Sequence, residues 1–360
     1  MKKDNGLIFS NLLTYSFAHA AVDATCAAVL LSNYSALKSD ADYFVFLILL
    51  YNVLAFSLQA PFGLLFDKLK KPVVSSVTGC FLTVIAAVLS SYPLIAVIFA
   101  GLGNALFHVG GGIISLNLKP GKASMPGIYV APGALGLMIG TLIGKNGYFV
   151  AWPFIVTLIV SAIIIYFIKS PQINYGTGKG TQIQWFELII ILLLISVTIR
   201  SLIGLAVDFP WKSNIYLLVC LTLAVVLGKA LGGFIADKFG WKRVSVISLL
   251  ISAPLISFGV DYPVLAITGI FLFNITMPVT LTAIANMLPG TAGFSFGLTT
   301  LALVTGALPT FTKAKIFFNG SFIILATILL SSASLYIGLR LYFNSKKYNI
   351  IKNNSSVHFN

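Results

Sequence analysis

The chain has 360 residues, of which 58% are hydrophobic and only 9% are charged, and its mean hydropathy is +0.98. Because soluble domains carry about a quarter charged residues, this composition indicates an integral membrane protein. The formal net charge is +14, but the cations stand between apolar segments, so we expect no nucleic-acid partner. No polar segment exceeds about 20 residues, too few for a soluble catalytic core, and we expect neither an enzyme nor a bound cofactor.

Twelve apolar segments are candidate membrane helices, since about 20 residues cross a hydrocarbon core of about 30 Å. In the N-terminal half they lie near 7–33, 43–66, 73–91, 94–116, 127–144 and 149–168. In the C-terminal half they lie near 186–208, 214–236, 244–260, 262–287, 292–309 and 319–343. The first segment is too long for a cleavable signal peptide. We therefore predict an all-α integral membrane protein with twelve transmembrane helices.

The cations are distributed unevenly between the two sides of these segments. With the N-terminus numbered as inside, sixteen of the 23 Lys and Arg residues lie in inner segments: Lys2, Lys3, Lys68, Lys70, Lys71, Lys119, Lys122, Lys169, Lys179, Lys238, Lys242, Arg243, Arg340, Lys346, Lys347 and Lys352. The outer loops hold five: Lys38, Lys145, Lys212, Lys313 and Lys315. Cytoplasmic loops carry the excess of Lys and Arg. This asymmetry predicts an even number of helices with both termini in the cytoplasm. We expect a multi-pass protein of a bacterial plasma membrane.

A polar stretch at 169–185, "KSPQINYGTGKGTQIQW", divides the chain into two halves. We expect a six-helix bundle at 1–168, a cytoplasmic linker at 169–185, a second six-helix bundle at 186–343 and a solvated, disordered cytoplasmic tail at 344–360.

The two halves share a sequence echo. "PFGLLFDKLKKPVVSS" (61–76) aligns with "LGGFIADKFGWKRVSV" (231–246) at an offset of 170, and a weaker echo links "MPG" (125–127) to "LPG" (288–290). A parallel repeat of this kind is typical of two similar bundles that enclose a transport path.

The aligned segments combine a glycine near a helix end, an aspartate and following cations. Glycine permits close helix approach, and an aspartate at the inner boundary can pair with the terminus of a neighbouring helix. The alternative is a plain stop signal of Lys and Arg, which leaves the repeated glycine and aspartate unexplained.

The aligned segments resemble the loop signature of the major facilitator superfamily, G-x-x-x-D-[RK]-x-G-[RK]-[RK]. The residues that carry it are Gly63, Asp67 and Lys68 in the first copy, with Lys70 where the family usually has glycine, and Gly233, Asp237, Lys238, Gly240, Lys242 and Arg243 in the second. The resemblance implies a carrier that works by rocker-switch alternating access, with both loops as cytoplasmic gates.

Ionisable residues inside apolar segments are costly, by ~2.5 to 3.5 kcal/mol on insertion scales, and they usually face a cavity or a partner. His19 and Asp23 stand four residues apart and so share one face of the first helix. We interpret them as a proton-linked pair in which a desolvated carboxyl loads and releases a proton. The alternative is an interhelical tether without proton exchange.

His108 lies near the middle of the fourth helix, with Asn104 four residues before it on the same face and three glycines after it. It is either part of the moving, proton-handling site or a core histidine bonded to Asn104 or to a backbone carbonyl. Only one other intramembrane histidine exists, and the spacing supplies no coordinating set, so we expect no metal site.

Arg200 stands beyond the middle of the seventh helix among apolar residues. A guanidinium keeps its charge, so it needs an anion: Asp23, Asp208 or the substrate itself. The alternative is a purely structural pair. Lys229 in the eighth helix is expected to extend its stem toward the inner interface.

The segments "HAAVD", "NALFH", "IRSL" and "GKALGGFIADKFG" together resemble one branch of the superfamily, the fosmidomycin-resistance type exporters. That branch also has a GxxxG segment in its fifth helix, here "GALGLMIG" (133–140). It commonly continues after the fourth-helix histidine with proline and an acid, where this chain has Val109 and Gly110.

The leading functional hypothesis is a monomeric secondary transporter in the lipid bilayer that exports a small drug-like or anionic molecule in exchange for protons. An uptake carrier for an organic anion, anchored at Arg200, is the alternative within transport. A membrane sensor or scaffold without transport would need a soluble output module, and the sequence shows none.

Overall fold

The computed structural model describes residues 2–32, 40–176, 184–312 and 314–357, with side chains from 5 to 345 within those ranges. Among these residues, ten helices or helix pairs are long and apolar enough to cross a membrane, and two shorter apolar helices, Pro72–Val88 and Ala151–Phe167, join them. The described chain is all-helical, which confirms the predicted fold class.

Six spans make up the N-terminal half. They are formed by α1 (Lys2–Ser32), α2 (Ala41–Asn52) with the π-helical turn η1 (Val53–Ser57) and α3 (Gln59–Leu69), α4 (Pro72–Val88), α5 (Pro93–Leu118), α6 (Ser124–Val130) with α7 (Gly133–Lys145), and α8 (Ala151–Phe167). The helices α4 and α5 begin at proline, whose missing N–H costs nothing in the first turn.

Six more spans make up the C-terminal half. They are formed by α9 (Phe186–Ala206), α10 (Ile215–Phe239), α11 (Trp241–Phe258), α12 (Pro263–Asn274) with α13 (Met277–Met287), α14 (Ala292–Ala307) with η3 (Leu308–Phe311), and α16 (Ser321–Val357). Short helices η2 (Pro210–Ser213) and α15 (Ala314–Phe317) lie in the loops before α10 and α16.

The structure differs from the predicted spans at three helices and at the tail. The second span contains the π-helical turn, and the fifth and tenth are broken before Pro132–Gly133 and around Thr276. Pro132 and Pro278 explain the breaks, because a proline supplies no N–H to the preceding turn. The apolar span of α16 ends at Ser345, close to the predicted boundary, but the helix continues to Val357, so the tail is helical there and not disordered. The tail's side chains from Lys346 onward, the linker residues 177–183 with Lys179, and Lys38 and Lys313 lie outside the described residues.

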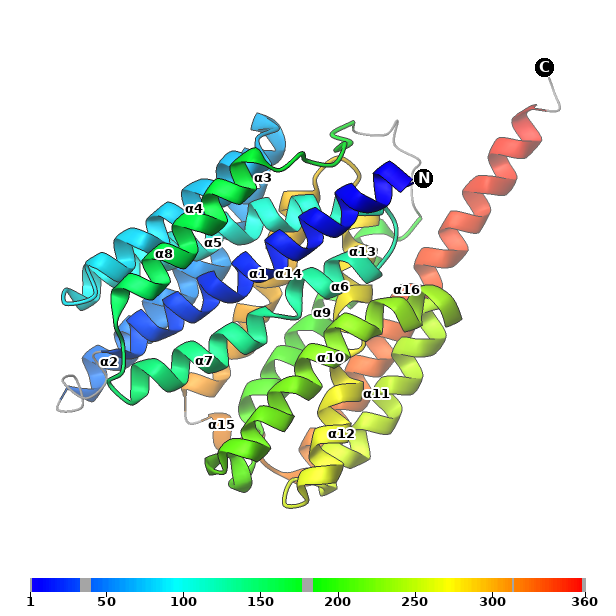
Figure 1. Ribbon diagram of the computed structural model, residues 1–360. Helices are drawn as coiled ribbons and strands as arrows, with labels where there is room; N and C mark the ends of the chain where they lie inside the picture. The colour runs from blue at the N-terminus through cyan, green and yellow to red at the C-terminus, as the bar shows by residue number, and fades with distance from the viewer. Residues whose placement is uncertain (1, 33–39, 177–183, 313, 358–360) are drawn as a thin grey trace.

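The two groups of helices lie side by side, with α1 to α8 on one side and most of α9 to α16 on the other (Figure 1). They meet chiefly where α14 packs against α3 and where α10 packs against α6. Glycines permit both contacts: a Cβ on Gly63 would collide with the backbone of Gly293, and one on Gly233 with the backbone of Ala123. The buried ionisable residues described below lie at this junction between the bundles.

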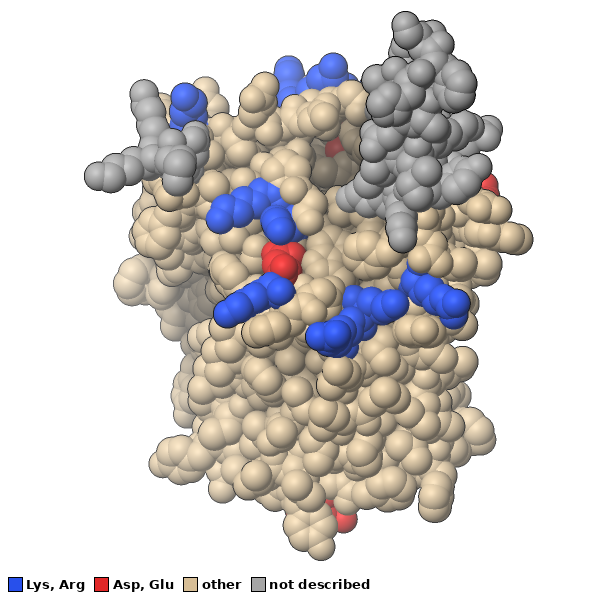
Figure 2. Space-filling view, turned by 90° about the vertical axis from the view of Figure 1, so that its right-hand side faces the viewer, with Lys and Arg blue, Asp and Glu red and all other residues tan. Residues whose placement is uncertain are grey.

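On the face drawn in Figure 2, the Lys and Arg side chains lie in the upper part, with acidic side chains among them, and the lower part is almost entirely uncharged. The start of α1 and the far end of α16 lie at the same end (Figure 1). The assignment of this end to the cytoplasm stays a prediction from the loop charges.

Candidate functional site

A cluster of four polar side chains lies inside the N-terminal bundle. His19 and Asp23 come from α1, and Asn104 and His108 come from α5. The Asn104 amide donates to Asp23 Oδ1 at 2.9 Å, and the Nε2 atoms of His19 and His108 lie 3.2 and 3.7 Å from the two Asp23 oxygens. The two Nε2 atoms are 2.8 Å apart. The structure therefore brings together four of the five residues predicted for the cavity, and we call them the His–Asp cluster.

Backbone carbonyls fix both imidazole rings. Nδ1 of His19 lies 2.8 Å from the carbonyl oxygen of Tyr129, and Nδ1 of His108 lies 2.8 Å from that of Asn104. The Phe296 ring of α14, which belongs to the other bundle, lies 6.4 Å from the His108 ring between centroids. The His–Asp cluster thus faces the junction between the bundles.

The predicted GxxxG segment of the fifth span packs α7 against α1. A Cβ on Gly136 or Gly140 would collide with the carbonyl oxygen of Ala20 or Ala24, respectively. One on Gly133 would reach both His19 Nε2 and Asp23 Oδ2 at 2.5 Å. The glycines therefore allow α7 to close over the His–Asp cluster without displacing it.

The expectation of no coordinating set rested on spacing along the chain. Helix packing instead places one ligand atom from each of His19, Asp23 and His108 within 4.8 Å of one another. Spacing along one helix could not reveal this, because His108 is contributed by α5.

Arg200 is buried on α9, with 8% of its surface exposed. Its guanidinium donates to the Thr276 hydroxyl at 2.6 Å and the Thr280 hydroxyl at 2.7 Å, and its Nε donates to the Ser196 carbonyl at 3.3 Å. Both threonine hydroxyls donate to backbone carbonyls, which leaves their lone pairs for the guanidinium.

No carboxylate of the described residues forms an ion pair with Arg200. Asp208, one of the predicted partners, instead pairs with Lys315 at 2.7 Å. The sequence analysis did not identify Thr276 and Thr280 as partners of Arg200, although their spacing of four in an apolar span places them on one helix face.

Lys229 differs from its predicted placement. It is only partly exposed, and its ammonium interacts electrostatically with Asp23 and with Arg200 instead of extending to the membrane surface. The junction between the bundles therefore holds two cations from the C-terminal bundle opposite one carboxylate from the N-terminal bundle.

The two repeated aspartates each bind the start of a helix in the other bundle. Asp67, at the end of α3, accepts from the N–H groups of Gly293 at 2.9 Å and Phe294 at 2.8 Å. Asp237, at the end of α10, accepts from the N–H groups of Ala123 and Ser124, both at 3.0 Å. A carboxylate is stabilised there by orphan N–H groups and the positive end of the helix dipole. We call these contacts the first and second latch.

Both the acceptors and the donors of the two latches follow the sequence repeat. Ala123 and Gly293, like Asp67 and Asp237, are 170 residues apart. The weaker echo of "MPG" and "LPG" is not equivalent in the structure, since 125–127 lies inside α6 whereas 288–290 precedes α14. The structural repeat is therefore the one at offset 170.

The remaining signature residues stand around the latches. Lys68, Lys238, Lys242 and Arg243 are exposed, and Trp241 rather than a cation donates to Asp237, at 2.9 Å. Lys70 has φ 58° and ψ 34°, the left-handed conformation that glycine adopts most easily, while Gly240 has φ 96°. The glycine that the resembled signature has at the position of Lys70 would adopt this backbone conformation without strain.

The described start of the linker lies beside the first latch. The Lys70 ammonium lies 5.9 Å from the centroid of the Tyr175 ring. Burial, with a smaller contribution from the Asp67 carboxylate, raises the pKa of the Tyr175 phenol to about 12. Tyr175 therefore stays neutral beside the latch.

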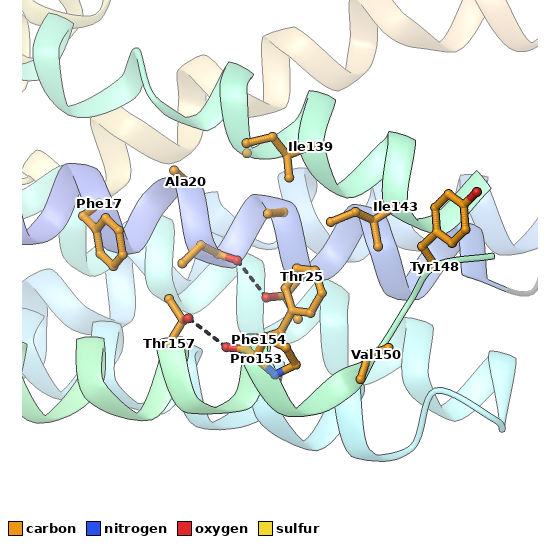
Figure 3. Close-up of a pocket in the computed structure, with 13 residues that line it drawn as sticks. Phe17, Ala20, Thr25, Ile139, Ile143, Tyr148, Val150, Pro153, Phe154 and Thr157 are labelled. Carbon is orange, nitrogen blue, oxygen red and sulfur yellow. Dashed lines mark hydrogen bonds between the residues drawn. The ribbon is translucent and has the colours of Figure 1, made fainter. Parts of the chain in front are cut away.

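A pocket of about 490 Å³ lies elsewhere, between α1, α7 and α8 of the N-terminal bundle (Figure 3). Its walls are apolar and include Phe17, Ile139 and Phe154. The hydroxyls of Thr25 and Thr157 donate within their own helices, to Ala21 and Pro153. With no ionisable group of the site in its walls, this pocket is not the candidate site for an anion.

Comparison with known proteins defines the fold. No family model and no curated protein matches the chain. Among solved structures, the E. coli fucose:proton symporter FucP matches with a TM-score of 0.68 at 13% identity over 92% of this chain and 97% of its own. The human organic anion transporter MFSD10 matches with a TM-score of 0.66 at 13% identity over 92% and 99%. A bacterial homologue of the iron transporter ferroportin matches with a TM-score of 0.61 at 13% identity over 95% and 99%.

These matches cover nearly the whole of each chain. The protein is a multi-pass membrane protein with the fold of these transporters, among which FucP is a major facilitator superfamily member.

Proposed function

We propose that this protein is a secondary active transporter that moves an anionic small molecule across the plasma membrane by alternating access, driven by protons. The observation that carries the proposal is Arg200, a buried guanidinium held by two threonine hydroxyls with no carboxylate in ion-pair contact among the described residues. A buried cation without a counter-ion is costly, and a substrate anion would supply one. Lys229 adds a second positive charge beside it.

The His–Asp cluster is the site proposed for the coupling proton. It contains three groups able to exchange protons, the buried His19 and His108 and the half-buried Asp23, and Lys229 lies within electrostatic range of Asp23 and His108 across the junction. Binding of an anion at Arg200 and Lys229 would change the field at the cluster, which offers a direct route for coupling. FucP, a fucose:proton symporter, is consistent with such coupling in this fold, and MFSD10, an organic anion transporter, is consistent with an organic anion as cargo.

The latches are proposed as the cytoplasmic gate. Both join the two bundles at the end of the molecule where most of the described cations lie, and both must break for that end to open. With this end inside, the termini are cytoplasmic, and the structure represents a state closed toward the cytoplasm. We infer that one chain suffices for transport, since both bundles belong to it.

Export is the proposed direction, following the resemblance to fosmidomycin-resistance type exporters at His19, Asp23 and His108. Val109 and Gly110, which replace that branch's proline and acid, leave the substrate class open beyond its negative charge. Uptake of an organic anion uses the same residues and differs only in the direction of flux.

A two-part experiment tests the function. Purified protein is first screened for thermal stabilisation by organic anions including phosphonates, because a ligand that prefers the folded state raises the melting temperature. The best compound is then assayed in proteoliposomes with a pH gradient of either sign, with Arg200→Gln as the test variant and Asp261→Asn, which removes a charge from an exposed loop, as the control for charge loss elsewhere.

Flux that follows the pH gradient, is lost in Arg200→Gln and is retained in Asp261→Asn supports the proposal, and its sign fixes export or uptake. Flux of neutral compounds alone, or flux unchanged in Arg200→Gln, would refute the anion site.

A further inference from the structure

The hydrogen bonds of the His–Asp cluster fix where its protons lie. A backbone carbonyl can only accept, so the 2.8 Å contacts to Tyr129 and Asn104 require a proton on Nδ1 of both His19 and His108. In a neutral imidazole with Nδ1 protonated, Nε2 carries a lone pair and no hydrogen. If both rings were neutral, two lone pairs would face each other.

The separation of those two atoms is inconsistent with two facing lone pairs. Nε2 of His19 and Nε2 of His108 are 2.8 Å apart, within the range of a strong hydrogen bond between nitrogens. A proton on the Asp23 carboxyl cannot satisfy this contact, because it would lie on oxygen and leave both Nε2 lone pairs in place. One ring must therefore be doubly protonated and donate to the other.

Asp23 provides the countercharge. Its oxygens lie 3.2 Å from His19 Nε2 and 3.7 Å from His108 Nε2, and one accepts from the Asn104 amide at 2.9 Å. One imidazolium and one carboxylate give the cluster no net charge, which is the arrangement favoured in a medium that solvates charge poorly.

We propose that one excess proton is held between Nε2 of His19 and Nε2 of His108 beside an ionised Asp23. This inference rests on the proposed function only where it identifies that proton as the coupling proton. The position of the proton itself follows from the hydrogen bonds. Asn104 is then a positioning residue: its backbone carbonyl accepts from His108, and its side-chain amide donates to Asp23.

The surroundings favour a proton over a metal ion, although three potential donor atoms converge. Ligand atoms around a tetrahedral zinc with bonds of about 2.0 to 2.1 Å are about 3.3 Å apart, longer than the 2.8 Å observed between the nitrogens. A divalent ion would also leave a net positive charge next to Lys229, which interacts with both Asp23 and His108.

The groups facing the cluster from other helices are few. Tyr51 from α2, Tyr129 from α6 and Lys229 from α10 interact electrostatically with Asp23, as does Cys26 from α1 itself. The packing elements α7 and α14 contribute Gly133 and Phe296, which do not titrate. None of these groups is a second carboxylate, so among them only Asp23 can balance the positive charge of the excess proton.

Nitrogen NMR of the imidazoles tests the proposal directly, since the chain has only three histidines and the third, His358, serves as an internal reference. The full-length protein labelled with 15N-histidine is measured in lipid nanodiscs between about pH 6 and 8. We expect one internal ring with both nitrogens protonated, and a scalar coupling between the two Nε2 nuclei across the hydrogen bond. In Asp23→Asn, of nearly equal shape, we expect the doubly protonated ring and the coupling to disappear at neutral pH.

The outcomes that overturn the proposal are equally direct. Both internal rings neutral with unprotonated Nε2 throughout the range would refute it. Lines shifted by a chelator would show a bound metal ion in place of the proton. The wild-type spectrum decides the matter even if Asp23→Asn fails to fold. If the wild-type protein shows the scalar coupling between the two Nε2 nuclei but transports no anion, the proposed function is refuted and this inference stands.

Discussion

The two latches predict a measurable conformational equilibrium. Asp67 and Asp237 each accept two backbone N–H groups at a helix start, at 2.8 to 3.0 Å. Hydrogen bonds to a charged acceptor contribute about 1.5 to 3 kcal/mol each. Asn in place of Asp keeps one acceptor oxygen but loses the charge and the second bond, so each substitution should destabilise the latched state by about 2 kcal/mol. That is about a 30-fold shift toward the unlatched state.

Spin labels in the two bundles would report this shift. Tyr148 and Tyr216 are 75% and 78% exposed and lie at the end of the molecule away from the latches, one in each bundle. In a rocking motion, opening the latched end closes this one. We therefore expect the distance distribution between labels at these positions to gain a shorter population in Asp67→Asn, and a larger one when Asp237→Asn is added.

Asp261→Asn, the same chemical change in an exposed loop, serves as the control. A double variant that folds as stably as this control and keeps the wild-type distance distribution would refute the assignment of the latches as a gate.

Three further substitutions test the packing and the anion site. Lys70→Gly should raise the free energy of unfolding by about 1 kcal/mol, because glycine adopts the left-handed backbone without strain, and an unchanged or lower melting temperature would contradict this. Gly136→Ala should lower thermal stability by about 2 kcal/mol, since its Cβ collides with the Ala20 carbonyl, whereas Gly204→Ala, with open space around it, should not lower stability. Arg200→Lys should weaken binding of the stabilising anion about tenfold or more, because an ammonium lacks the planar fork that the two threonine hydroxyls hold and that can bind an anion through two parallel hydrogen bonds; an equal melting-temperature shift in variant and wild type would refute this.

Much of the fold follows from the sequence because membrane helices are specified by local composition. The twelve apolar segments all appear as helices, and the repeat of Gly63 and Asp67 at Gly233 and Asp237 identified both latch aspartates. The partners of these aspartates could not be predicted from the sequence, because Gly293 and Ala123 contribute only backbone N–H groups, which every residue except proline has.

The site was predicted less completely, for a related reason. A spacing of four placed His19 beside Asp23 and Asn104 beside His108, but only the packing of α5 against α1 joins the two pairs. The prediction that Lys229 extends toward the inner interface was wrong because the length of a lysine side chain does not reveal which face of α10 meets the other bundle. Sequence pattern resolves neighbours on one helix, whereas the site is built between helices.

The hydrogen bonds divide into two classes that match the proposed motion. Those that hold the ionisable groups lie within one bundle: His19 and His108 bond to each other and to carbonyls of α6 and α5, and Arg200 of α9 bonds to the threonines at the start of α13. Those of the latches run between bundles. Movement of one bundle against the other can therefore break the latches while both charged sites keep their internal geometry. What changes is the separation of Asp23 from Lys229 and Arg200, so the electrostatic interaction between the sites depends on the conformation.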